Sequence, residues 1–262
     1  MVSRYELKED ALDLALGILQ LDRDPEHGIK HSKHFSPIFK WDLQKEWLRK
    51  FSTHPKLQPL VEEQFDVPWP SFEAMRAMPV GSLGFCAQQM FNQLGIDPLP
   101  PVNKNLRKVA ETNEKEEYLS RRLRKFHDIF HLVLGVDTSV AGEAAVQAYV
   151  AVSQQQPAVI AILSASMTHS FIYPDEHRMI WEAISFGAQV GLAGVFLEGC
   201  RWEEGWERPL AEWRSELGLT HLMENSPFQE EIHRWETFSS SKINTRALYN
   251  EASMIHTGKD PM

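Results

Sequence analysis

The segment Arg124-Lys125-Phe126-His127-Asp128-Ile129-Phe130-His131, followed later by Gly142-Glu143, predicts a helical fold and a candidate metal site. On an α-helix, His127 and His131 lie about 40° apart and about one turn along the axis. Asp128 falls about 100° from His127, so these three polar side chains share one quadrant, while Ile129 and Phe130 point elsewhere. Polar groups gathered on an otherwise apolar helix need a partner, which a divalent cation would supply.

Glu143 can join this group only if the helix ends before it. In a straight helix it would lie about 24 Å from His127 along the axis. Gly135 is suited to end one helix and Ser139 to cap the next, so we expect the chain to reverse direction there. The predicted metal ligands are therefore His127, Asp128, His131 and Glu143. Two imidazoles and two carboxylates suit zinc and also fit iron or manganese.

Each part of this pattern has a simpler interpretation. A single buried histidine or aspartate is usually a satisfied core residue, and an isolated HxxxH spacing occurs often by chance. The adjacent Asp128, together with a glutamate placed after a helix break, makes metal binding the favoured interpretation.

The signature HDxxH, eleven residues and then Glu resembles that of the Coq4 family of ubiquinone-biosynthesis proteins. Arginines precede it in both, here Arg122 and Arg124. The chain departs from the family's pattern at Gln147 and Val150, where the family tends to carry lysine and glutamate. Taken together, the similar elements cover about residues 78–219: Met78-Pro79-Val80-Gly81-Ser82-Leu83-Gly84, residues 118–131, Leu134-Gly135, Gly142-Glu143, Trp206-Glu207, and residues 210–219 with Arg214 and Leu217-Gly218.

This resemblance implies a metal-dependent protein of quinone biosynthesis. Its substrate would be a polyprenylated 4-hydroxybenzoate-type precursor, from which a decarboxylase or lyase removes the C1 carboxylate with hydroxylation at that carbon. Arg124 lies about 60° from His127 on the same helix face, where it would hold that carboxylate through bidentate hydrogen bonds. A solvated basic face is the simpler interpretation of both arginines, because Arg121 and Lys125 are their neighbours. Arg122 points about 140° away from His127 and is less suited than Arg124 to reach the same ligand. No residue is assigned a catalytic role.

Two other functions stay open. A non-catalytic scaffold would bind a prenylated precursor or another isoprenoid lipid, gather other quinone-biosynthesis enzymes and use the metal to hold two helices together. A metal-dependent hydrolase is the third alternative, because HD-type phosphohydrolases and zinc peptidases carry related histidine patterns. The further ligands that an HD hydrolase needs are not identifiable in this sequence.

Residues 184–197 combine large apolar side chains with Gly187, Gly191 and Gly194. A glycine inside a helix costs about 0.5–1 kcal/mol relative to alanine, so three of them need a reason. Close packing of two helices is the favoured reason. The alternative is a groove for a long apolar ligand, with residues 158–167 as its opposite wall.

Composition excludes some classes of function. A net charge of −9 argues against nucleic-acid binding. Cys86 and Cys200, the only cysteines, indicate a reducing compartment without a disulfide framework. The acidic residues near the N-terminus disfavour a signal or transit peptide, and residues 184–197 are shorter than the ~20 residues that span a bilayer. We therefore expect a cytoplasmic protein, with peripheral membrane contact and a homodimer as open alternatives.

Helical periodicity dominates the whole chain. We predict an all-α fold in one compact multi-helix domain over residues 1–262, with the metal site between two consecutive helices and residues 1–77 as a helical extension outside the resemblance. The predicted helices include residues 5–21, 114–134, 140–155, 158–171, 174–200 and 207–217.

Overall fold

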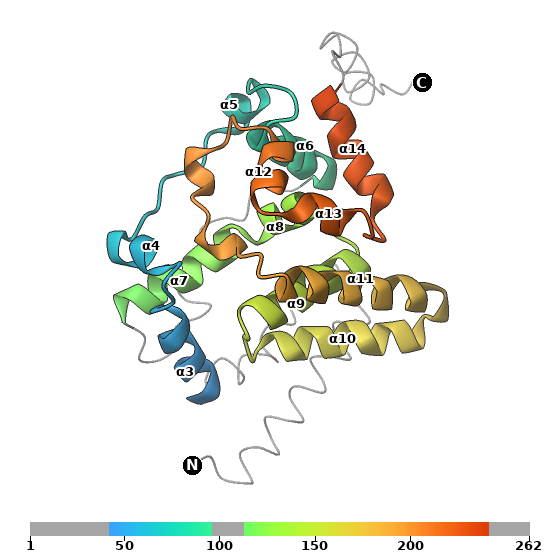
Figure 1. Ribbon diagram of the computed structural model, residues 1–262, viewed down its shortest axis with the longest axis horizontal. Helices are drawn as coiled ribbons and strands as arrows, with labels where there is room; N and C mark the ends of the chain where they lie inside the picture. Colours follow the sequence, from blue (N-terminus) through green and yellow to red (C-terminus); the bar gives the residue numbers. More distant parts are fainter. Residues whose placement is uncertain (1–41, 96–112, 241–262) are drawn as a thin grey trace, which may run out of the picture.

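Helices α9 (Val140–Ser153) and α11 (Pro174–Leu192) form the most extensive helix pair in the protein (Figure 1). The structure is a computed structural model that describes residues 42–95 and 113–240. A Cβ atom at Gly187 would lie 1.9 Å from the carbonyl oxygen of Ala145, and one at Gly191 would lie 2.7 Å from Cβ of Val152. The two glycines therefore allow α11 to lie directly against α9.

Helix α10 (Val159–Ile172) packs along both members of this pair and completes a three-helix layer. Most of the other helices lie on the side of α9 and α11 that faces away from α10 (Figure 1). In chain order they are α3 (Asp42–Phe51), α4 (Gln58–Glu63), α5 (Phe72–Arg76), α6 (Leu83–Leu94), α7 (Glu114–Lys125), α8 (His127–Leu134), the 3-10 turns η2 (Leu197–Gly199) and η3 (Trp202–Glu204), α12 (Leu210–Glu216), α13 (Leu219–Met223) and α14 (Gln229–Ser240).

Two segments far apart in the sequence are joined by main-chain hydrogen bonds. The N–H groups of Leu83 and Gly84 donate to the carbonyl oxygens of Arg208 and Trp206 at 2.9 and 2.8 Å, and that of Leu210 donates to the carbonyl of Gly81 at 2.9 Å. These bonds fix the start of α6 beside the start of α12, and both helices contact α8.

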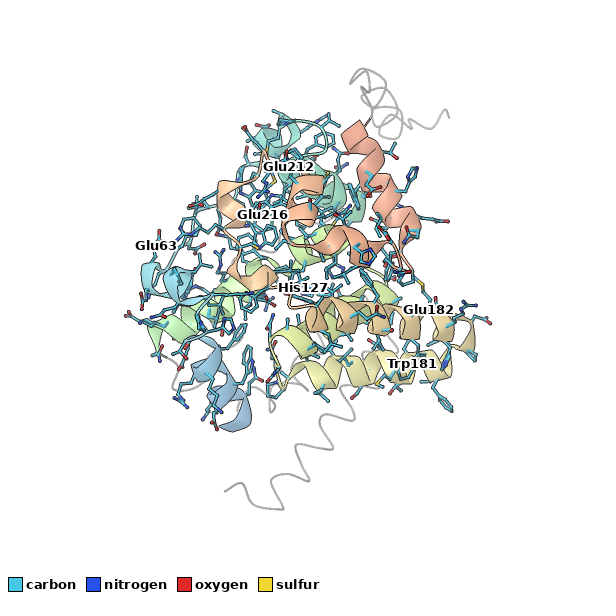
Figure 2. All side chains as sticks on the ribbon, viewed as in Figure 1. Glu63, His127, Trp181, Glu182, Glu212 and Glu216 are labelled. Atoms are coloured by element: carbon cyan, nitrogen blue, oxygen red, sulfur yellow. The ribbon has the colours of Figure 1, made fainter. Side chains whose placement is uncertain are left out.

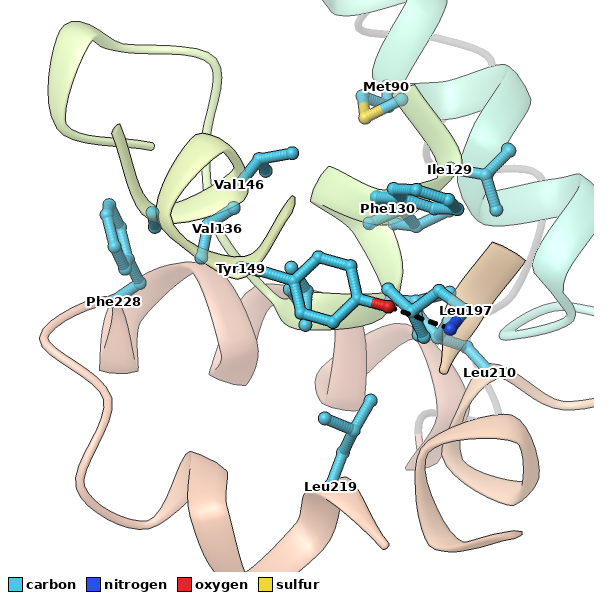
Figure 3. Close-up of a cluster of buried hydrophobic side chains, with 14 of the residues drawn as sticks. Met90, Ile129, Phe130, Val136, Val146, Tyr149, Leu197, Leu210, Leu219 and Phe228 are labelled. Carbon is cyan, nitrogen blue, oxygen red and sulfur yellow. Dashed lines mark hydrogen bonds between the residues drawn. The ribbon is translucent and has the colours of Figure 1, made fainter. Parts of the chain in front are cut away.

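The hydrophobic core surrounds α8 and α9. Phe130 and Ile129 of α8 are fully buried, and Tyr149 of α9 lies edge-on to Phe130 with ring centres 6.1 Å apart (Figure 3). The Tyr149 hydroxyl accepts the N–H of Leu197 and donates to the carboxylate of Glu198, both at 2.8 Å. A second, smaller cluster around Leu57 and Leu119 joins α3, α4 and α7. The helix that carries the two histidines is thus packed on several sides.

The all-α prediction is confirmed, because the described residues form helices and turns without any strand. In these parts of the chain, no helix has both the length and the apolar character needed to cross a membrane. The predicted helix over residues 174–200 ends early at Leu192, since Gly194 adopts a φ of +78° and 3-10 turns follow. The predicted helix over residues 5–21 lies outside the described residues.

The predicted single helix over residues 114–134 is wrong at Phe126. The structure divides it into α7 and α8, with Phe126 at φ −105° and ψ 5°. The Phe126 ring is buried, and it lies 4.8 Å from the guanidinium carbon of Arg122 and 5.8 Å from the ring of Trp69. The helix is therefore interrupted at a residue whose aromatic side chain packs into the core, and not at a glycine or proline.

Candidate metal centre

The connection between α8 and α9 reverses the chain as the sequence predicts. Gly135 ends α8 with a φ of +68°, and its N–H donates to the carbonyl oxygens of His131 and Leu132. Ser139 then caps α9, because its hydroxyl accepts the N–H of Gly142 at 3.2 Å. Glu143 stands in the first turn of α9 as a result, facing back towards α8.

Three side chains converge at this reversal. Ligand atoms of His127, His131 and Glu143 all lie within 4.8 Å of one another. Nε2 of His127 is 3.4 Å from Oε2 of Glu143, and Nε2 of His131 is 3.2 Å from Oε1 of the same carboxylate. Figure 2 labels His127 near the middle of the molecule. Two imidazole nitrogens therefore face the two oxygens of one carboxylate.

The hydrogen bond at Nδ1 of His131 determines that its other ring nitrogen, Nε2, carries the lone pair that could bind a metal. Nδ1 of His131 lies 2.7 Å from the carbonyl oxygen of Asp137, which can only accept, so Nδ1 carries the proton of that bond. In the neutral ring the lone pair is then on Nε2, which is buried and makes no hydrogen bond. Two acceptors facing each other at 3.2 Å repel unless a cation or a proton lies between them. This arrangement is the one expected of a metal-binding histidine.

Gly142 brings the Asp137 carbonyl into this position. A Cβ atom at residue 142 would lie only 1.9 Å from the carbonyl oxygen of Asp137, so only a glycine allows the connection to come this close to α9. The Asp137 side chain reinforces the turn, because its Oδ1 accepts the N–H of Ser139 at 3.1 Å and the hydroxyl of Ser139 at 2.6 Å. The local sequence thus sets the orientation of His131 as well as the position of Glu143.

Electrostatics at the site favour a positive charge among the three side chains. Burial alone would lower the pKa of His127, but the charge of Glu143 and a hydrogen bond to it raise that pKa overall. Burial opposes ionisation of Glu143, yet the two histidines hold the pKa of its carboxyl well below the usual value. His131 is fully buried, whereas the side chains of His127 and Glu143 are 27% and 40% exposed. The cluster is therefore open to solvent on one side, as a site that accepts a substrate requires.

The fourth predicted ligand, Asp128, does not join the converging group in this structure. Its carboxylate still interacts electrostatically with His127, His131 and Glu143. Burial is the main reason that the pKa of Asp128 is raised above its ordinary value. Its role as a metal ligand stays a prediction.

The two predicted arginines lie in different environments. Arg124 is partly buried near His127 and Asp128, and within the described residues it makes no hydrogen bond or ion pair. The expectation of a solvated basic face is wrong for Arg122, which is buried and pairs with Glu203 through two hydrogen bonds of 2.8 and 3.2 Å. It also donates to the carbonyl of Cys200 at 2.6 Å. Of the two arginines, Arg124 is thus the one near the site whose guanidinium is not already engaged in a hydrogen bond or ion pair.

The three glycines that were candidates for lining a lipid groove lie against helix α9 or in a turn. Gly187 and Gly191 face the backbone and side chains of α9, so close helix packing accounts for them and the groove interpretation is not needed. Gly194 lies beyond the end of α11, where its positive φ suits a turn.

Sequence reasoning missed two residues that hold the site helices. Glu203 pairs with Arg122 across 81 positions of sequence, and nothing local to it signals this contact. Arg214, which the sequence offered only through a resemblance, donates to the carbonyl oxygens of Leu132 and Val133 at 2.9 and 3.2 Å and so satisfies the C-terminal end of α8. Burial lowers the pKa of Arg214 to about 10. Glu203 thus holds α7 in place through Arg122, and Arg214 holds the end of α8.

Comparison with known proteins places the chain in a described family. The model of the family described as coenzyme Q (ubiquinone) biosynthesis protein Coq4 matches residues 50–223. A curated relative from Paracoccidioides brasiliensis, the mitochondrial ubiquinone biosynthesis protein COQ4, is 28% identical over 167 residues, which is 63% of this chain and 54% of that protein. The mitochondrial COQ4 homolog of Bos taurus is 27% identical over 147 residues, covering 56% of this chain and 53% of the relative. The chain thus spans about half the length of these relatives.

A solved structure supports the fold. A crystal structure from Nostoc punctiforme, of a protein named provisionally for ubiquinone biosynthesis, superposes with a TM-score of 0.62 at 21% sequence identity. The superposition covers 79% of this chain and 97% of the other. At this identity the likeness extends to the architecture of the helices alone.

Proposed function

The chain belongs to the Coq4 family of ubiquinone-biosynthesis proteins, and from that premise we propose that it is a metal-dependent protein of quinone biosynthesis. The proposed ligands are His127, His131 and Glu143. Asp128 is kept as a proposed fourth ligand, because its carboxylate interacts with both histidines. Zinc is the proposed metal, with iron or manganese as alternatives, since nitrogen and oxygen donors suit all three.

One observation carries this proposal more than any other. The Nε2 atom of His131 is buried, unprotonated in the neutral ring and without a hydrogen bond, and it faces an oxygen of Glu143 at 3.2 Å. A buried acceptor left in this state costs about 1–3 kcal/mol, and a cation between the two groups would remove that cost. The outer hydrogen bond from Nδ1 to the Asp137 carbonyl also matches the way metal-binding histidines are held.

The proposed reaction is the oxidative decarboxylation of a polyprenylated 4-hydroxybenzoate-type precursor. The bond from C1 to the carboxylate breaks with release of carbon dioxide, and a hydroxyl group takes its place on C1. Dioxygen supplies the oxygen atom of this hydroxyl, and an external two-electron reductant converts the second oxygen atom to water. A bound metal would supply Lewis acidity towards oxygen atoms of the ring.

The residues of this chain bind and orient the precursor. Arg124, which makes no hydrogen bond or ion pair in the described residues, would hold the departing carboxylate through two parallel hydrogen bonds. Its place next to His127 would set C1 beside the proposed metal ligands. The open side of the cluster, formed by the exposed parts of His127 and Glu143, gives the ring its access.

Metal content tests the proposal directly. Protein purified without chelator or affinity metal should contain about one metal ion per chain by mass spectrometry. The variants His131→Ala and Glu143→Gln should lose it while keeping the helical circular dichroism of the wild type. His221→Ala is the matched control, because His221 is a highly exposed histidine that does not belong to the group of His127, His131 and Glu143, and it should keep the metal.

Complementation then separates catalysis from a structural role. In a strain that lacks the native protein, a folded Glu143→Gln variant should fail to restore ubiquinone if the site is catalytic. Loss of the fold together with the metal would instead favour a non-catalytic scaffold that binds prenyl lipids. Well-folded wild-type protein without any metal would refute the proposed function.

A further inference from the structure

Helix α10 exposes large apolar side chains on one face. Ile160, Met167 and Phe171 are 61%, 41% and 83% exposed. Their spacing of seven and four residues places them on one side of the helix. The opposite side of α10 packs on α9 and α11, and Figure 1 shows α10 at the outer edge of this layer. Large apolar side chains in a row on the surface indicate a site that another segment or molecule covers.

This face can be covered without leaving polar groups unpaired. Residues 144–174 contain no Asp, Glu, Lys or Arg, although charged residues make up 24% of the chain. The hydroxyl groups of Ser164 and Thr168 donate to carbonyl oxygens of their own helix, at 2.7 and 2.8 Å. Covering them therefore costs little, because burial is expensive mainly for donors that lose their partner.

The chain enters the described part of the structure at the start of this same helix. The side-chain oxygen of Gln44 accepts the N–H of Ala158, which precedes α10, at 3.1 Å. Nearby, the indole N–H of Trp47 donates to the carbonyl of Gln154 at 2.7 Å. These bonds tie α3 to the beginning of α10. Residues 1–41 are therefore joined to the fold at one end of the exposed face.

Residues 5–21 have a matching apolar stripe. Leu7, Ala11, Leu14 and Ile18 recur at helical spacing, and Asp13 lies on the other side. A helix of this length measures about 25 Å and α10 about 21 Å. Residues 22–41 can span up to about 60 Å, which is enough to place the segment anywhere along α10.

We propose that residues 5–21 bind as an amphipathic helix across the Ile160, Met167 and Phe171 face of α10. The connection through residues 22–41 gives this contact an effective concentration in the millimolar range. A second copy is a weaker fit, because a pair of such helices buries well under the ~800 Å² per partner of a stable interface. A bilayer is also a weaker fit, since residues 144–174 offer no basic side chain to an anionic surface.

Disulfide trapping in the full chain tests this contact. The variant Leu14→Cys with Met167→Cys joins the middle of the segment to the middle of α10, so the two sites meet whichever way the helix runs. The native Cys86 and Cys200 give little background, because burial raises the pKa of each thiol to about 12. Asp13→Cys with Met167→Cys is the control, because residue 13 lies off the apolar stripe.

We expect mild oxidation to give an intramolecular disulfide in the Leu14 pair and much less in the Asp13 pair, with the protein remaining a monomer. A covalent dimer instead would show that a second copy covers α10 and would overturn the proposal. So would equal trapping in both pairs, or the lack of any disulfide.

Because a disulfide can also trap a contact that forms only rarely, a second measurement tests how much of the time the face is covered. Introducing Leu14→Asp should uncover the face and increase the rate of maleimide labelling at Met167→Cys several-fold. An unchanged labelling rate, in protein with wild-type circular dichroism, would contradict the proposed contact. Binding of the unmodified full chain to phosphatidylcholine vesicles that is lost in Phe171→Ser would assign the face to a bilayer and overturn the proposal as well.

Discussion

Replacing Gly142 with alanine is expected to weaken metal binding more than it weakens the fold. The added Cβ would lie 1.9 Å from the carbonyl oxygen of Asp137, whereas real Cβ atoms essentially never come closer than 3.0 Å. The turn and α9 must therefore separate by about 1 Å or more. Because the same carbonyl accepts the proton of His131 Nδ1 at 2.7 Å, that shift breaks the hydrogen bond that orients the ring.

The two effects differ in size. Overpacking costs about 1–3 kcal/mol, and alanine returns about 1 kcal/mol through its better helix propensity, so the net loss in the free energy of unfolding is about 0–2 kcal/mol. Loss of the outer hydrogen bond on a ligating histidine lowers metal affinity about 10–100-fold. That range corresponds to about 1.4–2.7 kcal/mol of binding free energy.

The assay measures both quantities on the same protein. Competition with a chromophoric chelator gives the metal dissociation constant, and urea unfolding of the metal-free protein gives the free energy of unfolding. Gly191→Ala is the control, because its Cβ would crowd Val152 at 2.7 Å near the other end of α9. It should lose stability and keep its metal affinity. A Gly142→Ala protein that binds metal within twofold of the wild type would refute this account of His131.

Three further substitutions test other contacts. Glu203→Gln leaves Arg122 buried without its ionic partner and should cost about 3–5 kcal/mol in urea unfolding, while Glu204→Gln on the surface should cost little; equal costs would count against a buried ion pair. Burial raises the pKa of Glu198 in the folded protein, so its ionisation destabilises the fold as pH rises above its unfolded value of about 4.5. Glu198→Gln should therefore gain stability relative to the wild type as the pH rises above about 4.5, and a difference that does not change with pH would show that the carboxyl is not perturbed. Arg124→Gln should keep its metal and fold but lower product formation at least about tenfold, unlike the exposed neighbour Arg121→Gln; normal turnover would remove Arg124 from the substrate site.

The parts of the site that the sequence predicts are those that depend on local chemistry. Gly135 ends α8 and Ser139 caps α9 because of conformational and hydrogen-bonding preferences that each residue carries by itself. These two signals suffice to predict that Glu143 returns to His131. The proximity of His127 to His131 likewise follows from helix periodicity alone.

The parts that the sequence does not predict depend on partners that are distant along the chain. Nothing near Phe126 marks a helix end, and its burial against Trp69 becomes apparent only in the folded protein. Arg122 and its neighbours form a basic run that is typical of an exposed helix face, whereas its buried partner Glu203 is 81 positions away in the sequence. For Gly187 and Gly191, sequence alone allows either close packing or a groove, and the contact with α9 that accounts for both glycines becomes apparent only in the folded protein.

The family match extends well beyond the ligands and includes distant contacts of this kind. The matched residues 50–223 begin before the carbonyl of Phe65, which accepts from Arg122 and from the hydroxyl of Tyr118, and so holds α7 from the side of α4. They end after Arg214, whose guanidinium satisfies the last carbonyls of α8. Between these limits lies each contact described above that fixes the two histidines relative to Glu143. A fragment restricted to α8 and α9 would keep the ligands in sequence but lose the side chains that orient their helices. We therefore expect metal affinity to require the whole matched region, because the site is held from both ends of it.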